Sequence, residues 1–159
     1  MKSEFFNLTK GVRGKLKSLL GDKVISKEVY LSKEKISFKA DIQINNDSEL
    51  IFIEIKESQT HPDTNVSKYW VYLEGNLNKK VKLIQIFGRG FSETENNYTS
   101  RKKLSEFIAK KIKLAFPKNF AYVPLNLKDF NYSQEDYKNK GTEITDKVIE
   151  LLKEYIDRD

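Results

Sequence analysis

Two carboxylates and one lysine occupy positions where together they could bind a metal ion. Residues 36–44 alternate apolar and polar side chains, and residues 50–57 form an apolar-rich run after a turn cluster, which predicts two β-strands joined in a hairpin. In the register that keeps the apolar side chains on one face, Asp41 lies opposite Glu54, and Lys56 projects from the same face as Glu54. Opposed side chains have Cβ atoms about 4.5–5.5 Å apart, so the two carboxylates would repel each other. A protonated carboxyl group or a divalent cation would relieve this repulsion, and hard oxygen ligands suit Mg²⁺ or Mn²⁺.

The apolar face of the hairpin specifies this register. It pairs Ile44 with Ile51, Ile42 with Ile53 and Ala40 with Ile55, and on the polar face it pairs Lys39 with Lys56. A slip of one residue would turn every one of these side chains to the other face. An earlier strand over residues 24–31, closed by a turn at 32–35, would place Glu28 opposite Lys39 and diagonal to Asp41. Glu28 is then either a third carboxylate ligand of the metal or simply the ion-pair partner of Lys39.

The remaining periodicity predicts the elements that position this hairpin. We expect helices over residues 3–20, from Pro62–Thr64 to Gly75, from Thr99 or Ser100 to Ala115, and from Thr142 onward. We expect further strands over residues 81–87 and 121–127, the latter an edge strand or extended loop because it contains Pro124. This order predicts an α/β fold with a mixed sheet of four or five strands flanked by helices on both faces. The 159 residues are expected to form one domain, with a core over about 1–116 and a C-terminal helical extension over about 117–159.

The composition excludes several kinds of site. The chain has no Cys and one His, which excludes disulfides, zinc fingers, iron–sulfur clusters and multi-histidine metal sites. No apolar run approaches the ~20 residues that a membrane span needs, and the N-terminus lacks the apolar core of a signal peptide. We therefore expect a soluble cytoplasmic protein with no membrane partner.

Positive charge is concentrated in two parts of the chain. The net charge is +6 overall, with +6 in each of the segments 1–40 and 81–120 and −3 in each of the segments 41–80 and 121–159. Basic segments on either side of an acidic one indicate an anionic polymer as partner and a cation held within the acidic segment. The alternative is a lysine-rich, solvated surface without a specific partner.

A carboxylate on one strand followed by Glu-x-Lys on the next resembles the PD-(D/E)XK nuclease superfamily. The match is Asp41 with Glu54-x-Lys56, and the order of elements over residues 1–90 is similar to the core of that family. The proline that often precedes the first acid in the family is replaced by Ala40. The resemblance implies a restriction-endonuclease-like fold.

The resemblance also implies an activity, which is metal-dependent hydrolysis of phosphodiester bonds with DNA as the expected partner. Asp41 and Glu54, with a backbone carbonyl of the third strand, would bind Mg²⁺ or Mn²⁺. Lys56 would position or help to deprotonate the attacking water. The basic segments Lys10–Lys39 and Arg101–Lys118 would hold the nucleic-acid backbone by salt-sensitive attraction.

Several other residues are candidates for contact with nucleic acid: Gln59, His61, Lys68, Arg89, Arg101, Lys102 and Lys103. For His61 the alternative is an incidental loop histidine, and for Arg89 it is a tight turn after a strand. Asn65, Lys68 and Tyr72 share the side of one predicted helix opposite Trp70, where they line a cleft or face solvent. Two alternatives to an active nuclease are a catalytically silent nucleic-acid-binding or protein-interaction module and a subunit of a restriction or repair complex. A homodimer or a larger nuclease complex is compatible with cleavage of both strands of a duplex.

Overall fold

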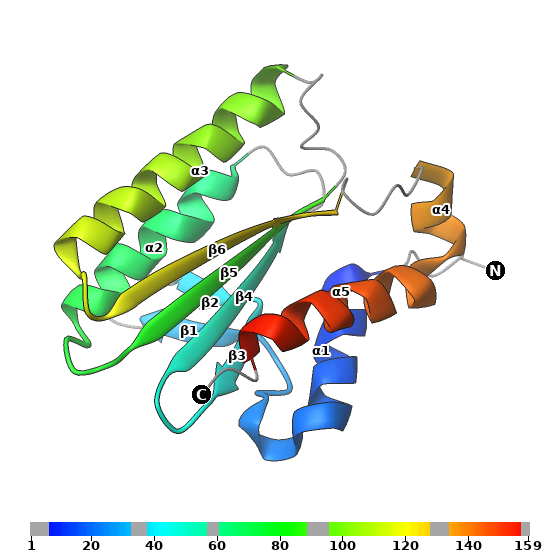
Figure 1. Ribbon diagram of the computed structural model, residues 1–159, viewed down its shortest axis with the longest axis horizontal. Helices are drawn as coiled ribbons and strands as arrows, with labels where there is room; N and C mark the ends of the chain where they lie inside the picture. The colour runs from blue at the N-terminus through cyan, green and yellow to red at the C-terminus, as the bar shows by residue number, and fades with distance from the viewer. Residues whose placement is uncertain (1–6, 33–37, 57–60, 89–95, 128–133, 157–159) are drawn as a thin grey trace.

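The chain folds as an α/β structure in which helices cover both faces of a mixed sheet (Figure 1). The computed structural model describes residues 7–32, 38–56, 61–88, 96–127 and 134–156. In chain order the elements are α1 (Leu8–Leu20), a 3₁₀ turn (Gly21–Lys23), β1 (Val29–Ser32), β2 (Phe38–Ala40), β3 (Ile42–Asn45), β4 (Leu50–Lys56), α2 (Pro62–Glu74), β5 (Val81–Phe87), α3 (Asn96–Ala115), β6 (Phe120–Asn126), α4 (Gln134–Asn139) and α5 (Gly141–Ile156). No helix within the described ranges is long and apolar enough to cross a membrane.

The main sheet has four strands in the order β3-β4-β5-β6. β3 pairs antiparallel with β4, whereas β4, β5 and β6 run parallel to one another. β1 and β2 form a separate antiparallel pair. Strands β4 and β5 are buried along nearly their whole length, as expected for parallel strands covered on both faces.

Each face of the sheet packs against its own pair of helices. Alternate residues of β4 supply the two cores: Ile51, Ile53 and Ile55 pack with α1 and α5, and Phe52 packs with α2 and α3. In Figure 1, α1 and α5 lie together on one side of the sheet, and α2 and α3 lie together on the other. Because side chains of a strand alternate between faces, Glu54 projects with Phe52 toward α2.

Helix α1 ends at Leu20 as predicted, but it begins at Leu8 and not at residue 3. The side chain of Asn7 accepts a hydrogen bond from the backbone N–H of Lys10 at 3.1 Å, which caps the first turn. Leu8, Val12 and Leu16 recur at helical spacing and are buried against the sheet. The helix ends at Gly21, whose φ of 61° favours a residue without a Cβ atom. The part of the predicted helix before Asn7 lies outside the described residues.

The predicted hairpin register is confirmed where β3 pairs with β4. Ile42 lies opposite Ile53, and Ile44 lies opposite Ile51. The ladder ends at Ile42, because the chain bends at Asp41. The three pairs that were predicted beyond this point are not part of it: Ala40 with Ile55, Asp41 with Glu54, and Lys39 with Lys56.

Pairing with β1 explains the break in the predicted second strand. Ala40 lies opposite Val29, and Lys39 lies opposite Tyr30. Residues two apart in a regular strand share a face, but Ala40 packs with α2 and α3, whereas Ile42 packs with α1 and α5. The bend at Asp41 therefore moves Ala40 to the opposite core, and the prediction of one continuous strand over 36–44 is wrong.

The predicted first strand is also interrupted. Val24 forms an isolated bridge to Ile44, and β1 begins only at Val29. Residues 26–28 are exposed polar residues that bend away between these two segments. As a result Tyr30, and not Glu28, lies opposite Lys39 in the ladder.

The C-terminal third adds a strand and a helix to the same structure. β6 is the edge strand next to β5, which is a position that tolerates Pro124 because proline has no backbone N–H to donate. Helix α3 begins at Asn96, a few residues before the predicted start. Helix α5 begins at Gly141, one residue before the predicted start, and buries Ile144, Val148 and Leu152. The short helix α4 was not predicted.

Candidate functional site

Asp41 is held in place at the bend between β2 and β3. Its Oδ2 atom accepts a hydrogen bond from the backbone N–H of Ile55 at 3.0 Å. Its own backbone carbonyl accepts two hydrogen bonds from the Arg13 guanidinium, at 2.6 Å from Nη2 and 3.2 Å from Nε. The carboxylate thus continues the link to β4 beyond the last ladder pair, while α1 fixes the backbone of the bend. Asp41 is half-buried.

Glu54 is buried two residues before the end of β4, an inner strand of the sheet, with 1 % of its surface exposed. Its Oε1 atom accepts a hydrogen bond from the Tyr69 hydroxyl at 2.7 Å and forms an ion pair with Lys68 Nζ at 2.5 Å. Burial, the largest effect, raises the pKa of Glu54 from 4.5 to about 7. The ammonium of Lys68 lowers this pKa, and the nearby charge of Asp41 raises it further. The two carboxyl groups therefore interact, although no ladder pair joins their residues.

Lys56 ends strand β4 on the same face as Glu54, two residues further along. Its side chain is half-buried. Its backbone carbonyl accepts a hydrogen bond from the N–H of Gly88 at 2.6 Å, so β4 and β5 remain joined at this end. The lysine of the Glu-x-Lys motif is thus anchored by its backbone at the end of the sheet where Asp41 and Glu54 interact.

Helix α2 turns three polar side chains toward the sheet. Asn65, Lys68 and Tyr69 recur at helical spacing and have exposed fractions of 9 %, 5 % and 0 %. The Nδ2 atom of Asn65 has no hydrogen-bond partner among the described residues. The sequence left Asn65 and Lys68 either in a cleft or facing solvent, and the structure buries both, with Lys68 against Glu54.

A buried polar network fixes the start of α2 to the sheet. Gln85 of β5, which lies opposite Glu54 in the ladder, donates from Nε2 to the carbonyl of Pro62 at 3.0 Å. Its Oε1 atom accepts a hydrogen bond from the Tyr122 hydroxyl of β6 at 2.6 Å. Burial raises the pKa of Tyr122 well above its usual range, so the phenol remains a donor. This network sets the position of α2, and with it the position of Lys68 against Glu54.

Sequence reasoning missed four residues that support the site. These are Arg13, Tyr69, Gln85 and Tyr122. Gln85 had a detectable signal, because it is a neutral polar residue inside the otherwise apolar run Leu83–Phe87. The helical spacing of Tyr69 on α2 is that of a core residue, which is correct for its ring, but its hydroxyl also bonds to Glu54.

Glu28 lies apart from the acid pair. It forms an ion pair with Lys39 at 3.5 Å, and both side chains are about half exposed. Lys39 also places its ammonium 4.9 Å from the centre of the Tyr30 ring. This geometry favours the interpretation of Glu28 as the partner of Lys39. Within the described ranges, no three His, Cys, Asp or Glu residues are grouped as a metal-binding cluster.

The other residues predicted to contact nucleic acid are spread over α2 and α3. His61 is exposed just before α2, and its carbonyl accepts a hydrogen bond from the Thr64 hydroxyl at 2.7 Å. On α3, Lys103 is exposed, Lys102 lies 5.4 Å from the centre of the Phe87 ring, and Arg101 approaches Asp63 at 3.7 Å. Gln59 and Arg89 lie outside the described residues.

The donor set at the acid pair fits Mg²⁺ or Mn²⁺. Mg²⁺ usually keeps several waters and is held by one or two carboxylates, so Asp41 and Glu54 suffice without a third acid. The hydrogen bonds and the ion pair given above engage Oδ2 of Asp41 and Oε1 of Glu54, so each carboxyl group has a second oxygen. Two interacting carboxylates, one of them fully buried, form a local negative charge that a divalent cation would offset.

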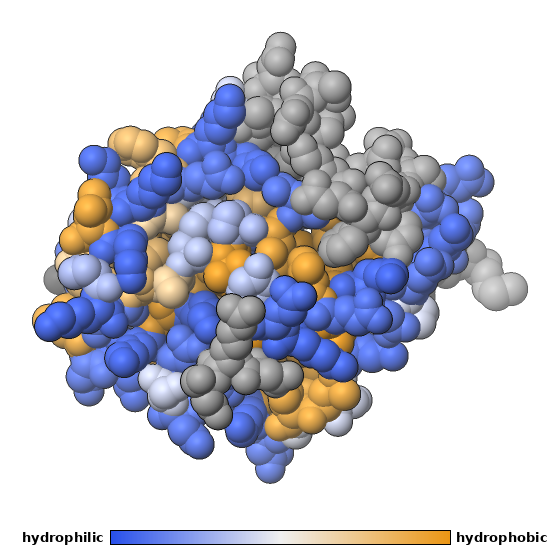
Figure 2. Space-filling model, in the orientation of Figure 1, coloured by the Kyte–Doolittle hydropathy of each residue, from blue (hydrophilic) through white to orange (hydrophobic). Residues whose placement is uncertain are grey.

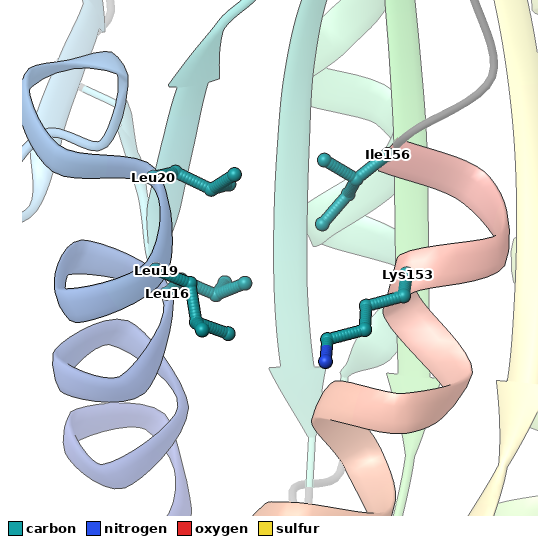
Figure 3. Close-up of a pocket in the computed structure, with 5 residues that line it drawn as sticks. All are labelled: Leu16, Leu19, Leu20, Lys153 and Ile156. Carbon is teal, nitrogen blue, oxygen red and sulfur yellow. The ribbon is translucent and has the colours of Figure 1, made fainter.

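A pocket elsewhere in the molecule has different chemistry. It lies between α1 and α5 and is lined by Leu16, Leu19, Leu20, Ile156 and Lys153 (Figure 3). Figure 2 shows hydrophilic side chains over most of the visible face, with an apolar patch at the end of α1. This pocket is on the face of the sheet opposite Glu54, and its lining contains no carboxylate.

No protein-family model matches the chain, and no curated protein and no solved structure is detectably similar to it.

Proposed function

We propose that this protein is a metal-dependent nuclease with a restriction-endonuclease-like fold, and that it hydrolyses phosphodiester bonds in DNA. The observation that carries the proposal is the interaction between the carboxyl groups of Asp41 and Glu54. Lys56 lies two residues beyond Glu54 on β4 and is on the same face of the sheet. The order of elements supports it, because a hairpin leads through α2 to the parallel strand β5.

Asp41 and Glu54 would hold Mg²⁺ or Mn²⁺. When bound, the ion lowers the pKa of a water molecule and neutralises charge on the phosphate. The residues around it keep the two carboxylates in place before substrate arrives. The Ile55 N–H and Arg13 fix Asp41, and Tyr69 fixes Glu54. Such preorganisation is the main contribution that a protein makes to charge stabilisation in a transition state.

Lys56 supplies positive charge from the chain itself. Its ammonium would stabilise the negative charge that develops on the phosphate and would orient the attacking water. The side chain is half-buried at the end of β4, which limits its range of positions. A lysine so restricted loses less conformational freedom on contact with a phosphate than a fully exposed one.

The charge of the surface supports a polyanionic substrate. Helix α3 carries exposed lysines at positions 103, 110, 111 and 113, and helix α1 carries Lys10 and Lys15. Contacts of this kind bind the phosphate backbone without reading sequence, and they weaken steeply as salt rises.

A second candidate function is a nucleic-acid-binding module that does not cleave. The ion pair between Lys68 and Glu54 favours it, because an ammonium already neutralises the buried acid. The two candidates share the same binding surface and differ in whether the acid pair takes up a metal.

The test is a cleavage panel of supercoiled plasmid, linear duplex, single strands, a branched junction and RNA. Each substrate is incubated with the wild-type protein in Mg²⁺, Mn²⁺ or EDTA. Asp47→Asn is a matched control for Asp41→Asn, because Asp47 is an exposed acid in the turn of the same hairpin. Metal-dependent cleavage that survives Asp47→Asn but not Asp41→Asn supports a nuclease. Salt-sensitive binding without cleavage supports the silent module.

A further inference from the structure

The Lys68 side chain links β4, which carries Glu54, to β2, which ends just before Asp41. Its Nζ atom lies 2.5 Å from Oε1 of Glu54 on β4 and 2.5 Å from the backbone oxygen of Lys39 on β2. The side chain is 6 % exposed, and the Glu54 side chain is 1 % exposed. Asp41 follows Lys39 by two residues, at the bend where β2 ends and β3 begins. The ammonium therefore lies against one member of the acid pair and close in sequence to the other.

We propose that Lys68 is an internal cation that holds Glu54 in the metal-free protein and competes with a divalent cation for the acid pair. This inference rests on the proposed function, because it requires that Asp41 and Glu54 take up a metal. It goes beyond that function by assigning a regulatory role to a lysine outside the Glu-x-Lys motif.

The contacts of Lys68 explain why it would compete and not assist. A metal ligated by Glu54 needs an oxygen within about 2.0–2.1 Å for Mg²⁺, and Lys68 already engages Oε1 of that carboxylate. Two cations at one buried carboxylate repel each other, and solvent ions screen a buried pair poorly. A metal therefore has to displace the ammonium or bind more weakly beside it.

The same contacts explain why a lysine suits this position in the metal-free protein. Without a cation, Glu54 would be a buried carboxylate whose remaining hydrogen-bond partner among the described residues is the Tyr69 hydroxyl. Leaving a buried charge uncompensated is strongly destabilising, so the ionised form of Glu54 in the metal-free protein requires a positive group at this point. A lysine suits the role because its compact charge sits on a flexible stem that can withdraw.

Other lysines in the neighbourhood have different partners. Lys39 directs its ammonium to Glu28 and Tyr30. Lys82 provides a matched control, because it is also largely buried, forms an ion pair with Glu49 at 2.8 Å, and donates to a backbone carbonyl, that of Tyr155. Lys82 thus has the same kinds of contact as Lys68, but on the opposite side of the sheet, with α5.

The experiment is calorimetric titration of Mn²⁺ into the metal-free protein at fixed pH and salt. Removing the charge in Lys68→Met should lower the Kd for Mn²⁺ by on the order of tenfold, which corresponds to about 1.4 kcal/mol. Lys82→Met should leave the Kd unchanged. Thermal unfolding gives a second readout: Lys68→Met should have a lower Tm than wild type without metal and a larger increase in Tm with Mn²⁺.

Lys68→Gln is a second variant that keeps the test valid if Lys68→Met does not fold. Its amide can donate a hydrogen bond toward Glu54 or the Lys39 carbonyl without carrying charge, so the same decrease in Kd is expected. A Kd that is unchanged or higher in the folded Lys68 variants overturns this inference and leaves the metal site standing. An absence of Mn²⁺ binding in wild type and in every variant overturns the proposed function and the inference with it.

Discussion

The backbone N–H of Ile55 donates a hydrogen bond to Oδ2 of Asp41 across 3.0 Å, at the point where β3 stops pairing with β4. A side chain here takes over from the backbone as the link between the two strands. The chain before Asp41 is thereby free to turn away and pair with β1. The same bend brings the Lys39 carbonyl to the ammonium of Lys68, so the break in the strand forms part of the candidate site.

The link that Asp41 makes between strands and its proposed role as a metal ligand can be separated by substitution. Asp41→Asn retains an oxygen acceptor for the Ile55 N–H, so its free energy of unfolding should remain within about 1 kcal/mol of wild type. Asp41→Ala leaves that N–H without its acceptor and should lose about 1–3 kcal/mol. Both should lose metal-dependent cleavage. Urea denaturation and plasmid cleavage measure the two effects, and equal stability losses in both variants would contradict the hydrogen bond.

Tyr69 contributes to stability through its bond to Glu54. Tyr69→Phe removes the hydroxyl that donates to the buried carboxylate at 2.7 Å, and should lower the free energy of unfolding by about 1–3 kcal/mol. Tyr72→Phe is the control, because Tyr72 is half-buried and its ring packs on Phe52 at 5.5 Å. Its loss should be within about 0.5 kcal/mol. Similar effects of the two substitutions in chemical denaturation would refute a special role for the Tyr69 hydroxyl.

Arg13 positions Asp41 from helix α1. Arg13→Met removes both hydrogen bonds to the Asp41 carbonyl and should cost about 1–3 kcal/mol of stability. It should also reduce the cleavage rate by on the order of tenfold, because a ligand displaced by a fraction of an ångström is poorly placed for catalysis. Lys15→Met on the same helix breaks an exposed ion pair with Asp146 at 3.0 Å and should cost at most about 1 kcal/mol. Unchanged cleavage by Arg13→Met would show that the bend holds without it.

The stability of the metal-free protein should fall as pH rises through the range set by Glu54. Its pKa is 4.5 when unfolded and about 7 when folded, so between these values the folded state keeps a proton that the unfolded state has released. Stability is therefore fully retained below the unfolded value and decreases across this window, with a slope of up to about 1.4 kcal/mol per pH unit. Glu54→Gln should remove this slope.

The matched control for the pH dependence is Glu150→Gln, on an exposed position of α5. This substitution should leave the slope of the wild type intact. Urea midpoints measured in EDTA between pH 4.5 and 7 provide the comparison. A wild-type slope that is flat or positive across the window would contradict the assignment to Glu54.

The hairpin register could be predicted because a shifted register would be strongly destabilising. Shifting Ile42, Ile44, Ile51 or Ile53 by one position would expose an apolar face that is fully buried. The bend at Asp41 could not be predicted in the same way. Ala40 continues the apolar alternation, and it leaves the face only because β1 and helix α2 provide a second core for it.

The environment of Lys68 was equally inaccessible to sequence. Its neighbours on α2, Val66 and Tyr69, define a buried stripe, and a lysine at the edge of such a stripe usually extends its ammonium into solvent. The buried carboxylate of Glu54 and the backbone carbonyl of Lys39 make full burial favourable here. The residues of the proposed site follow from spacing on two predicted strands, whereas the contacts around them come from helices α1 and α2.

The most direct test of the account is cleavage of supercoiled plasmid by folded Asp41→Asn and wild-type protein, side by side in Mn²⁺. The account predicts nicking by wild type that EDTA abolishes, and no nicking by Asp41→Asn at matched stability. Cleavage by Asp41→Asn at the wild-type rate, or wild-type cleavage that persists in EDTA, would contradict the claim that the acid pair at the end of β4 is the metal-dependent active site.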